Sequence, residues 1–203
     1  MKRISPIMFI SLALLPLLSS CASYKAVALS NLSIVSVQSG WQSKSEEIQV
    51  VAKAFNKSDC KRYLDRDVIA AGYQPVQLYI QNNSNKPFIF SVERVSLPCA
   101  TAEEVAEKTH TSTVGRATGY AAGGLFFWPL FIPAIIDGVK SSQANSALDI
   151  DFSFKVACNQ TIFPYAHFNK ILFVPQGQYQ SAFSIVLLDG DSGKPKKIQV
   201  SVI

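Results

Sequence analysis

The sequence has few of the residues on which most catalytic and metal sites depend. It contains only two histidines, His110 and His167, and neither stands at the spacing of a zinc-binding motif. No Gly-x-Ser-x-Gly, His-Glu-x-x-His or phosphate-loop pattern occurs, and the four cysteines form no Cys-x-x-Cys pair. We therefore expect a protein that is not an enzyme and that binds no metal ion and no cofactor.

Charged residues are also scarce, at 16% of the chain, and they form no long block of one sign. No run of five or more Lys and Arg occurs, and Lys2 and Arg3 alone account for two units of the formal net charge of +5. This pattern argues against a nucleic-acid partner. The 48% content of hydrophobic residues argues against a disordered chain.

The first 21 residues have the organisation of an export signal. Lys2 and Arg3 precede an apolar stretch from Ile7 to Leu18, which is shorter than the roughly 20 residues of a spanning helix. Leu18-Ser19-Ser20-Cys21 then resembles a lipobox, the cleavage signal of bacterial lipoproteins. We predict a signal peptide over residues 1–20, the rival reading being an ordinary secretory leader followed by an incidental cysteine.

The lipobox resemblance implies where the protein resides. It implies a diacylglycerol on the Cys21 sulfur and usually a third acyl chain on its amine, and several chains give stable anchoring to membrane lipid. Ala22 follows the cysteine instead of the aspartate that usually retains lipoproteins in the inner membrane. We expect a lipidated tether over residues 21–30 and residence at the outer membrane of a Gram-negative bacterium, facing either the periplasm or the exterior.

Three cysteines remain once Cys21 is acylated. Exported chains meet an oxidising compartment, so an odd number suggests one disulfide and one spare thiol. Cys99 and Cys158 flank a helical hairpin that we expect at residues 100–157. The out-and-back course of such a hairpin returns its two ends to neighbouring points on a sheet. We predict a Cys99–Cys158 disulfide, with Cys60 either free or pairing instead.

Most of the mature chain has the alternating apolar and polar pattern of β-strands. Val76 to Gln81 alternates strictly, an Asn-rich cluster follows at 82–85, and Phe88, Phe90 and Val92 resume the alternation, which predicts a hairpin. We predict a mainly β fold with an α insertion: an immunoglobulin-like antiparallel β-sandwich over residues 31–203. The further expected strands lie at 32–37, 48–55, 171–174, 182–188 and 198–202, and a short helix within 58–71 is left open.

A helical hairpin is expected to interrupt the strands at residues 100–157. Thr101 and Glu104 read as a capping box at the start of its first helix. The sequence from Leu125 to Pro133 contains too much proline for one straight helix, so a second helix is expected from about Pro133 to Lys155.

Small residues recur every four positions in both predicted helices, and such ridges let helices approach closely. An uncharged aromatic tip joins the two helices. In one reading the tip packs on the sandwich; in a second it dips into the bilayer, with Arg116, Asp137 and Lys140 as a polar rim; in a third the ridges assemble several copies into an oligomer or pore. The residues expected to make helix-packing or membrane contacts are Gly115, Gly119, Gly123, Phe126, Phe127, Trp128, Phe131, Ala134, Gly138 and Ser142.

Two resemblances to known proteins accompany these patterns. The spacing of Gly115, Gly119 and Gly123 is similar to glycine-zipper segments of some bacterial envelope lipoproteins. The order of features over most of the mature chain resembles bacterial lipoproteins built on an Ig-like sandwich: Gly72-Tyr73-Gln74-Pro75 before the strand 76–83, then 137–142, then Phe173-Val174. The resemblance implies a fold and a location but no activity.

Two functions are therefore expected from the sequence. The first is a non-enzymatic envelope lipoprotein whose sandwich binds an envelope protein partner or has a structural role, with Trp41, Phe88 and Tyr179 as candidate contact aromatics. The second is a protein that inserts into membranes or forms oligomers through residues 115–142. Asp189-x-Asp191-x-Gly193 opens like a calcium loop but has Val200 at the last ligand position, so we expect no calcium there.

Overall fold

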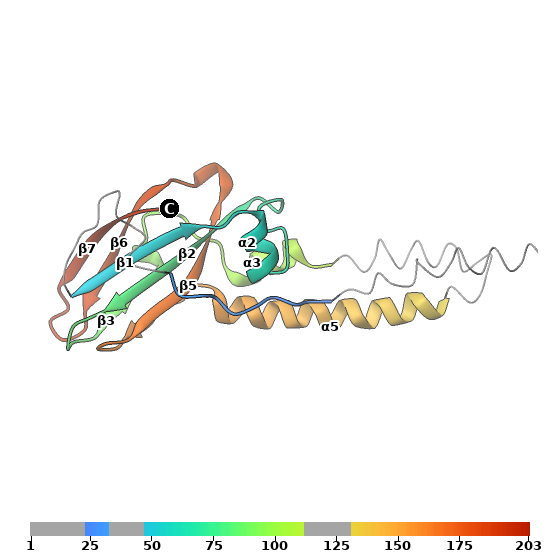
Figure 1. Cartoon of the computed structure of the whole chain (residues 1–203), viewed down its shortest axis with the longest axis horizontal. Coiled ribbons are helices and arrows are strands. Elements are labelled where there is room, and N and C mark those ends of the chain that lie inside the picture. The colour runs from blue at the N-terminus through green and yellow to red at the C-terminus, as the bar shows by residue number, and fades with distance from the viewer. Residues whose placement is uncertain (1–22, 33–46, 112–130) are drawn as a thin grey trace, which may run out of the picture. The chain divides into compact units, whose positions relative to one another are not determined.

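A computed structural model of the chain describes residues 23–32, 47–111 and 131–203, with the side chains of 131–138 excepted (Figure 1). Residues 25–109 and 149–203 form one compact unit, and residues 110–148 belong to a second unit that also includes the N-terminal 24 residues. The first unit contains both sheets.

The fold of the described residues is mainly β with an α insertion, as the sequence predicted. A three-stranded antiparallel sheet has the order β1-β2-β5, and a four-stranded antiparallel sheet has the order β4-β3-β6-β7. The strands are β1 (Ile48–Ala54), β2 (Tyr73–Asn82), β3 (Phe88–Phe90), β4 (Gln160–Ile162), β5 (His167–Pro175), β6 (Ala182–Asp189) and β7 (Pro195–Ser201). The helices are α2 (Lys57–Tyr63), α3 (Ala102–Thr109) and α5 (Phe131–Lys155), with 3₁₀ turns η3 (Val92–Arg94) and η5 (Gln176–Gln178).

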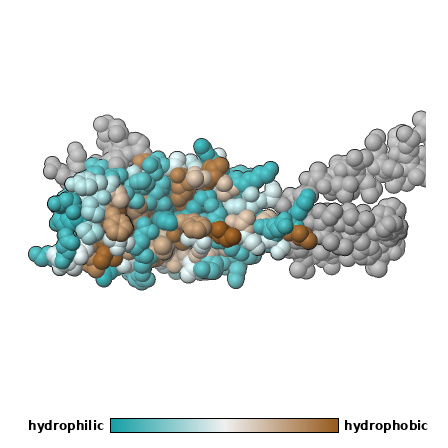
Figure 2. Space-filling view, turned by 90° about the horizontal axis from the view of Figure 1, so that it is seen from below, coloured by the Kyte–Doolittle hydropathy of each residue, from teal (hydrophilic) through white to brown (hydrophobic). Residues whose placement is uncertain are grey.

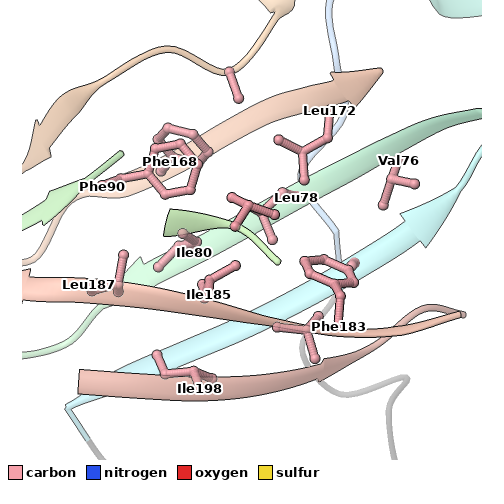
Figure 3. Packing of buried hydrophobic residues seen from close by; sticks show 14 of the residues in the cluster. Val76, Leu78, Ile80, Phe90, Phe168, Leu172, Phe183, Ile185, Leu187 and Ile198 are labelled. Carbon is pink, nitrogen blue, oxygen red and sulfur yellow. The ribbon is translucent and has the colours of Figure 1, made fainter. Parts of the chain in front are cut away.

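The main core lies between the two sheets. Alternate residues of β2, Val76, Leu78 and Ile80, point toward Phe183 and Ile185 of β6, as Figure 3 shows. The rings of Phe90 and Phe168 meet at 4.5 Å between centroids. The chain after β7 closes one side of the sandwich, because Val202 bridges to Ala52 of β1.

The predicted hairpin over residues 76–92 is wrong, because β2 and β3 belong to different sheets. The Asn-rich connection is a corner between the sheets, organised by the fully buried side chain of Asn82. Its Nδ2 donates to the carbonyls of Lys86 at 2.8 Å, Ile162 at 3.2 Å and Phe163 at 3.0 Å. Its Oδ1 accepts from the backbone and the hydroxyl of Ser84. These bonds turn the chain from one sheet into the other.

The three-stranded sheet is also covered on its outer face. Val51, Tyr79, Ile171 and Phe173 point away from the main core and are nevertheless buried. Phe152 of α5 packs on Phe173 with ring centroids 5.3 Å apart. The outer layer consists of α2, α3, the last turns of α5 and the segment 25–32.

Both ends of the helical insertion reach the same strand, as the sequence predicted. Ala100 bridges to Phe173 and Val156 bridges to Ile171, two residues away on the free edge of β5. Thr101 Oγ1 accepts from the Glu104 amide at 3.2 Å, which confirms half of the predicted capping box. The other half is absent, because the Glu104 carboxylate accepts a hydrogen bond from the Tyr73 hydroxyl.

Candidate functional site

The residues that follow the predicted anchor are part of the fold. The Val27 amide donates to the Arg62 carbonyl at 3.1 Å, and the Lys25 amide donates to Asp65 Oδ2 at 2.9 Å. Farther along, the Ser30 carbonyl accepts from Gln77 Nε2 at 2.7 Å, so the segment covers a polar side chain that is only 1% exposed. The stretch that the sequence assigned to a tether is thus fixed on the sandwich from Lys25 onward.

Lys155 joins three parts of the chain beneath this segment. Its buried ammonium donates to the carbonyl of Val27 at 2.8 Å and to the carbonyl of Tyr63 at 2.6 Å. It also pairs with Asp151 Oδ2, one turn earlier in α5, at 2.6 Å. One charge therefore connects the N-terminal segment, the end of α2 and the end of α5, and the ion pair with Asp151 offsets part of the cost of burying it.

Asp65 is the acidic centre of the neighbouring surface. It follows the C-cap residue of α2 and has a positive φ of 49°, a backbone conformation that aspartate tolerates better than most residues. Its buried carboxylate accepts from the Lys25 amide and pairs with Lys61 and Arg66. The cations around it stay largely in solvent: Lys25, Lys57, Lys61 and Arg62 are all exposed.

A groove of about 740 Å³ lies between η3, α3 and the end of α5. Apolar side chains such as Val95, Leu97 and Ala157 line it together with Glu93 and Glu103. Asn159 donates to both carboxylate oxygens of Glu93, at 3.2 and 3.1 Å. A hydrogen bond from its own backbone, followed by the one from Asn159, lowers the pKa of Glu93. The groove therefore has an apolar lining with fixed negative charge.

The predicted Cys99–Cys158 disulfide is absent from the structure, where Cys60, Cys99 and Cys158 are all free thiols. Cys99 and Cys158 do line the same groove. The Cys99 sulfur is, however, directed to the Leu97 carbonyl at 3.4 Å, while Cys158 is exposed to solvent. Burial raises the pKa of Cys99 to about 11, and burial followed by Asp67 and Asp59 raises that of Cys60 to about 11. Both thiols are therefore protonated at neutral pH and are poor nucleophiles.

A network of ion pairs occupies the region around the β6–β7 turn. Lys86 Nζ lies 3.0 Å from Asp189 Oδ2 and 3.8 Å from Glu47, and Lys196 Nζ lies 2.9 Å from Glu47. Asp189 Oδ1 also accepts from the amides of Asp191 and Ser192. These bonds, with that of Lys86, hold the pKa of Asp189 well below its usual range. The Asp189 carboxylate thus organises this turn.

The described histidines and candidate contact aromatics are each placed by their own packing. The exposed ring of His167 stacks on Tyr79 with centroids 5.6 Å apart, and His110 belongs to the second unit. Phe88 belongs to the core and is 1% exposed, and Tyr179 packs against this core. Both aromatics therefore contribute to packing. Trp41 lies outside the described residues.

The structure describes only part of the predicted helical hairpin. Cys21, Gly115, Gly119, Gly123, Phe126, Phe127 and Trp128 lie outside the described residues, and only the backbone of Phe131, Ala134 and Gly138 is described, in α5. Ser142 is exposed, whereas the buried positions of α5 include Ser141, Ala144 and Leu148. Within the described residues, no helix is both long enough and apolar enough to cross a membrane.

Sequence reasoning missed the residues on which the N-terminal segment depends. Lys155 and Asp65 belong to no motif. Their partners in the N-terminal segment, Val27 and Lys25, lie 128 and 40 residues away along the chain. Comparison of the chain with protein-family models, with curated proteins and with solved structures gives no match. The functional argument therefore rests on the sequence and on this geometry.

Proposed function

We propose that the chain is a non-enzymatic lipoprotein of the bacterial outer membrane, anchored through acyl chains on Cys21, whose sandwich serves as a structural or protein-interaction module in the envelope. The resemblance of residues 18–21 to a lipobox supports the anchor. The observation that carries the proposal is the fixed course of the chain from Lys25, only four residues after Cys21.

This observation supports a short anchor in place of a long flexible one. Lipid chains at Cys21 would hold the sandwich beside the bilayer, since four residues span at most about 14 Å. The segment 25–32 also covers Gln77 on the outer face of the three-stranded sheet. Anchoring and folding would therefore use one stretch of chain. A domain displayed in this way meets envelope partners close to the membrane surface.

One observation favours a second candidate, a protein that inserts or oligomerises through residues 115–142. Val139, Ile150 and Phe154 of α5 are 54%, 59% and 70% exposed. Val139 belongs to the segment 115–142, and Ile150 and Phe154, four residues apart, share one side of the same helix farther along. Figure 2 shows that apolar residues also reach the surface at separate places among polar ones. Exposed apolar side chains on a helix are a surface that another chain or a lipid can cover.

Fractionation of a chain exported with a non-lipid leader and carrying Cys21→Ala separates the two candidates. We expect this variant in the soluble periplasmic fraction, with the wild type in membranes as the control. A variant that still sediments with membranes after a carbonate wash would contradict the proposal in favour of insertion. Deletion of residues 119–137 in the same background checks that result, because only an inserting hairpin would then be released.

A further inference from the structure

We infer that the surface formed by Lys25, Lys57, Lys61 and Arg62 lies against the bilayer and binds the headgroups of anionic phospholipids. We call these four residues the basic face. The inference rests on the proposed anchor at Cys21 and adds the orientation of the sandwich and the chemistry of its contact with lipid.

Contacts within the structure bring the backbone at Lys25 to the end of α2, the helix that carries the other three cations. The Lys25 amide and the Lys61 ammonium bind the same carboxylate, that of Asp65. The Val27 amide binds the Arg62 carbonyl, so the N-terminal segment runs beside the end of α2. Lys57 precedes Lys61 by one turn of this helix and so shares its side. All four side chains are exposed, and the side chain of Lys61 is 77% exposed.

The acids near the basic face leave it with an excess of positive charge. Asp65 is buried, and Asp59 is partly buried and pairs with Lys53 at 3.0 Å. The Asp59 carboxylate also accepts from the amide of Asn56, the residue that caps the start of α2. Asp67 is exposed and accepts from the Ala70 amide. The glutamates of α3 add negative charge to the same unit, so the attraction to lipid is a property of the local surface and not of the net charge.

The length of the chain places this surface within reach of the headgroups. With Cys21 at the bilayer surface, Lys25 lies at most about 14 Å from it. This limit is comparable to the Debye length of about 8–10 Å at physiological ionic strength. Each basic residue near an anionic membrane contributes about 1 kcal/mol, which is about fivefold in affinity. Lys25, Lys57 and Arg62, next to an acyl anchor, therefore favour one orientation of the sandwich, and Lys61 adds less because it pairs with Asp65.

Chemical footprinting of lysines on the acylated protein tests this orientation. The full-length mature lipoprotein is reconstituted into vesicles of phosphatidylcholine, with or without phosphatidylglycerol, and is acetylated briefly before peptide mass spectrometry. We expect slower modification of Lys25, Lys57 and Lys61 on the anionic vesicles, with the difference lost in high salt. Lys194 and Lys197 are exposed around the β6–β7 turn and serve as internal controls that do not change.

A paired variant makes the test specific for charge. Lys57→Gln with Arg62→Gln removes two cations, so the attraction should weaken by about 25-fold and Lys25 should regain its reactivity. Lys61 is left in place because it pairs with the buried Asp65. Lys194→Gln with Lys197→Gln is the matched control and should leave the footprint unchanged.

The outcomes separate this inference from the proposed function. Intact mass on the same sample reports acylation of Cys21. Equal lysine modification on neutral and anionic vesicles, with Cys21 acylated, would overturn the lipid contact alone. A protein without acyl chains would overturn the proposed anchor. Equal protection by inorganic phosphate without anionic lipid would also overturn the inference, since the face would then bind a free anion and not a surface.

Discussion

Replacement of Lys155 by methionine should release the N-terminal segment from the sandwich. Methionine keeps most of the aliphatic volume but has no ammonium to donate. The carbonyls of Val27 and Tyr63, which accept from Lys155 at 2.8 and 2.6 Å, would lose this donor in a buried setting. Asp151 would lose its ion pair with Lys155 as well, but its side chain is 27% exposed and water can replace the lysine.

The cost follows from these contacts. A hydrogen bond to a charged group contributes about 1.5–3 kcal/mol, and the ion pair with Asp151 adds little after screening by solvent. Relief from burying the ammonium offsets part of the loss. We therefore expect Lys155→Met to lower the free energy of unfolding by about 3 kcal/mol, and Tm by about 6–12 °C at this chain length.

Urea unfolding and hydrogen exchange measure the two consequences. Asp151→Asn is the matched control and should cost less than about 1 kcal/mol, because it leaves both carbonyls paired. Exchange of the Val27 amide, which donates to Arg62, should accelerate more in Lys155→Met than that of Ile185 in the sandwich core. An unfolding free energy within 0.5 kcal/mol of wild type, a shift of the size of ordinary surface changes, would refute this reasoning.

Three further predictions concern other parts of the fold. Asn82→Leu should cost about 3–4 kcal/mol in urea unfolding because it removes the buried corner bonds, whereas Asn83→Ala, at an exposed neighbour, should stay within about 0.5 kcal/mol. In native Cys21→Ala protein at pH 8, iodoacetamide should modify Cys158 rapidly and Cys60 and Cys99 slowly; two or more fast thiols would contradict the burial that raises the pKa of both to about 11. Because these thiol pKa values are raised on folding, the stability they contribute should also decline as pH rises from about 9 toward 11. Asp189→Asn should lower Tm at pH 7, and the difference should shrink as pH falls through the ordinary range of a carboxyl pKa, since folding lowers the pKa of Asp189; a difference that persists in acid would contradict this.

The strands were largely predictable because each carries its own alternating pattern. The expected strands at 48–55, 171–174, 182–188 and 198–202 all correspond to observed strands, and α5 ends at Lys155 as predicted. The three-residue strand β4 (Gln160–Ile162) is too short to produce a pattern and was missed. Alternation also does not indicate which sheet a strand joins. The predicted pairing of β2 with β3 is wrong because the buried Asn82 turns the chain from one sheet into the other.

The surroundings of β2 show a second limit of local patterns. Strict alternation is typical of a strand with one face in water, yet Gln77 is buried on its polar face. Its amide donates to the Ser30 carbonyl and to Asn169 Oδ1, each at 2.7 Å. The partners come from 47 residues before and 92 residues after it, so no window along the sequence contains them. A buried polar residue that is fully paired looks like a solvated one in the sequence.

The residues of the candidate site also include some that a local sequence pattern predicts and some that it does not. The proposed anchor at Cys21 comes from a linear pattern, the resemblance to a lipobox, and the joint approach of Ala100 and Val156 to β5 followed from the out-and-back course of the insertion. Lys155 and Asp65 act through backbone carbonyls and amides, which any residue supplies. Their role is visible only in three dimensions.

Intact mass spectrometry of the protein extracted from bacterial membranes tests the central claim most directly. We predict a mature chain that begins at Cys21 and carries a diacylglycerol and an amide-linked acyl chain, with no such mass in the Cys21→Ala variant. A wild-type chain that begins at another residue, or that begins at Cys21 without acyl mass, would contradict the account.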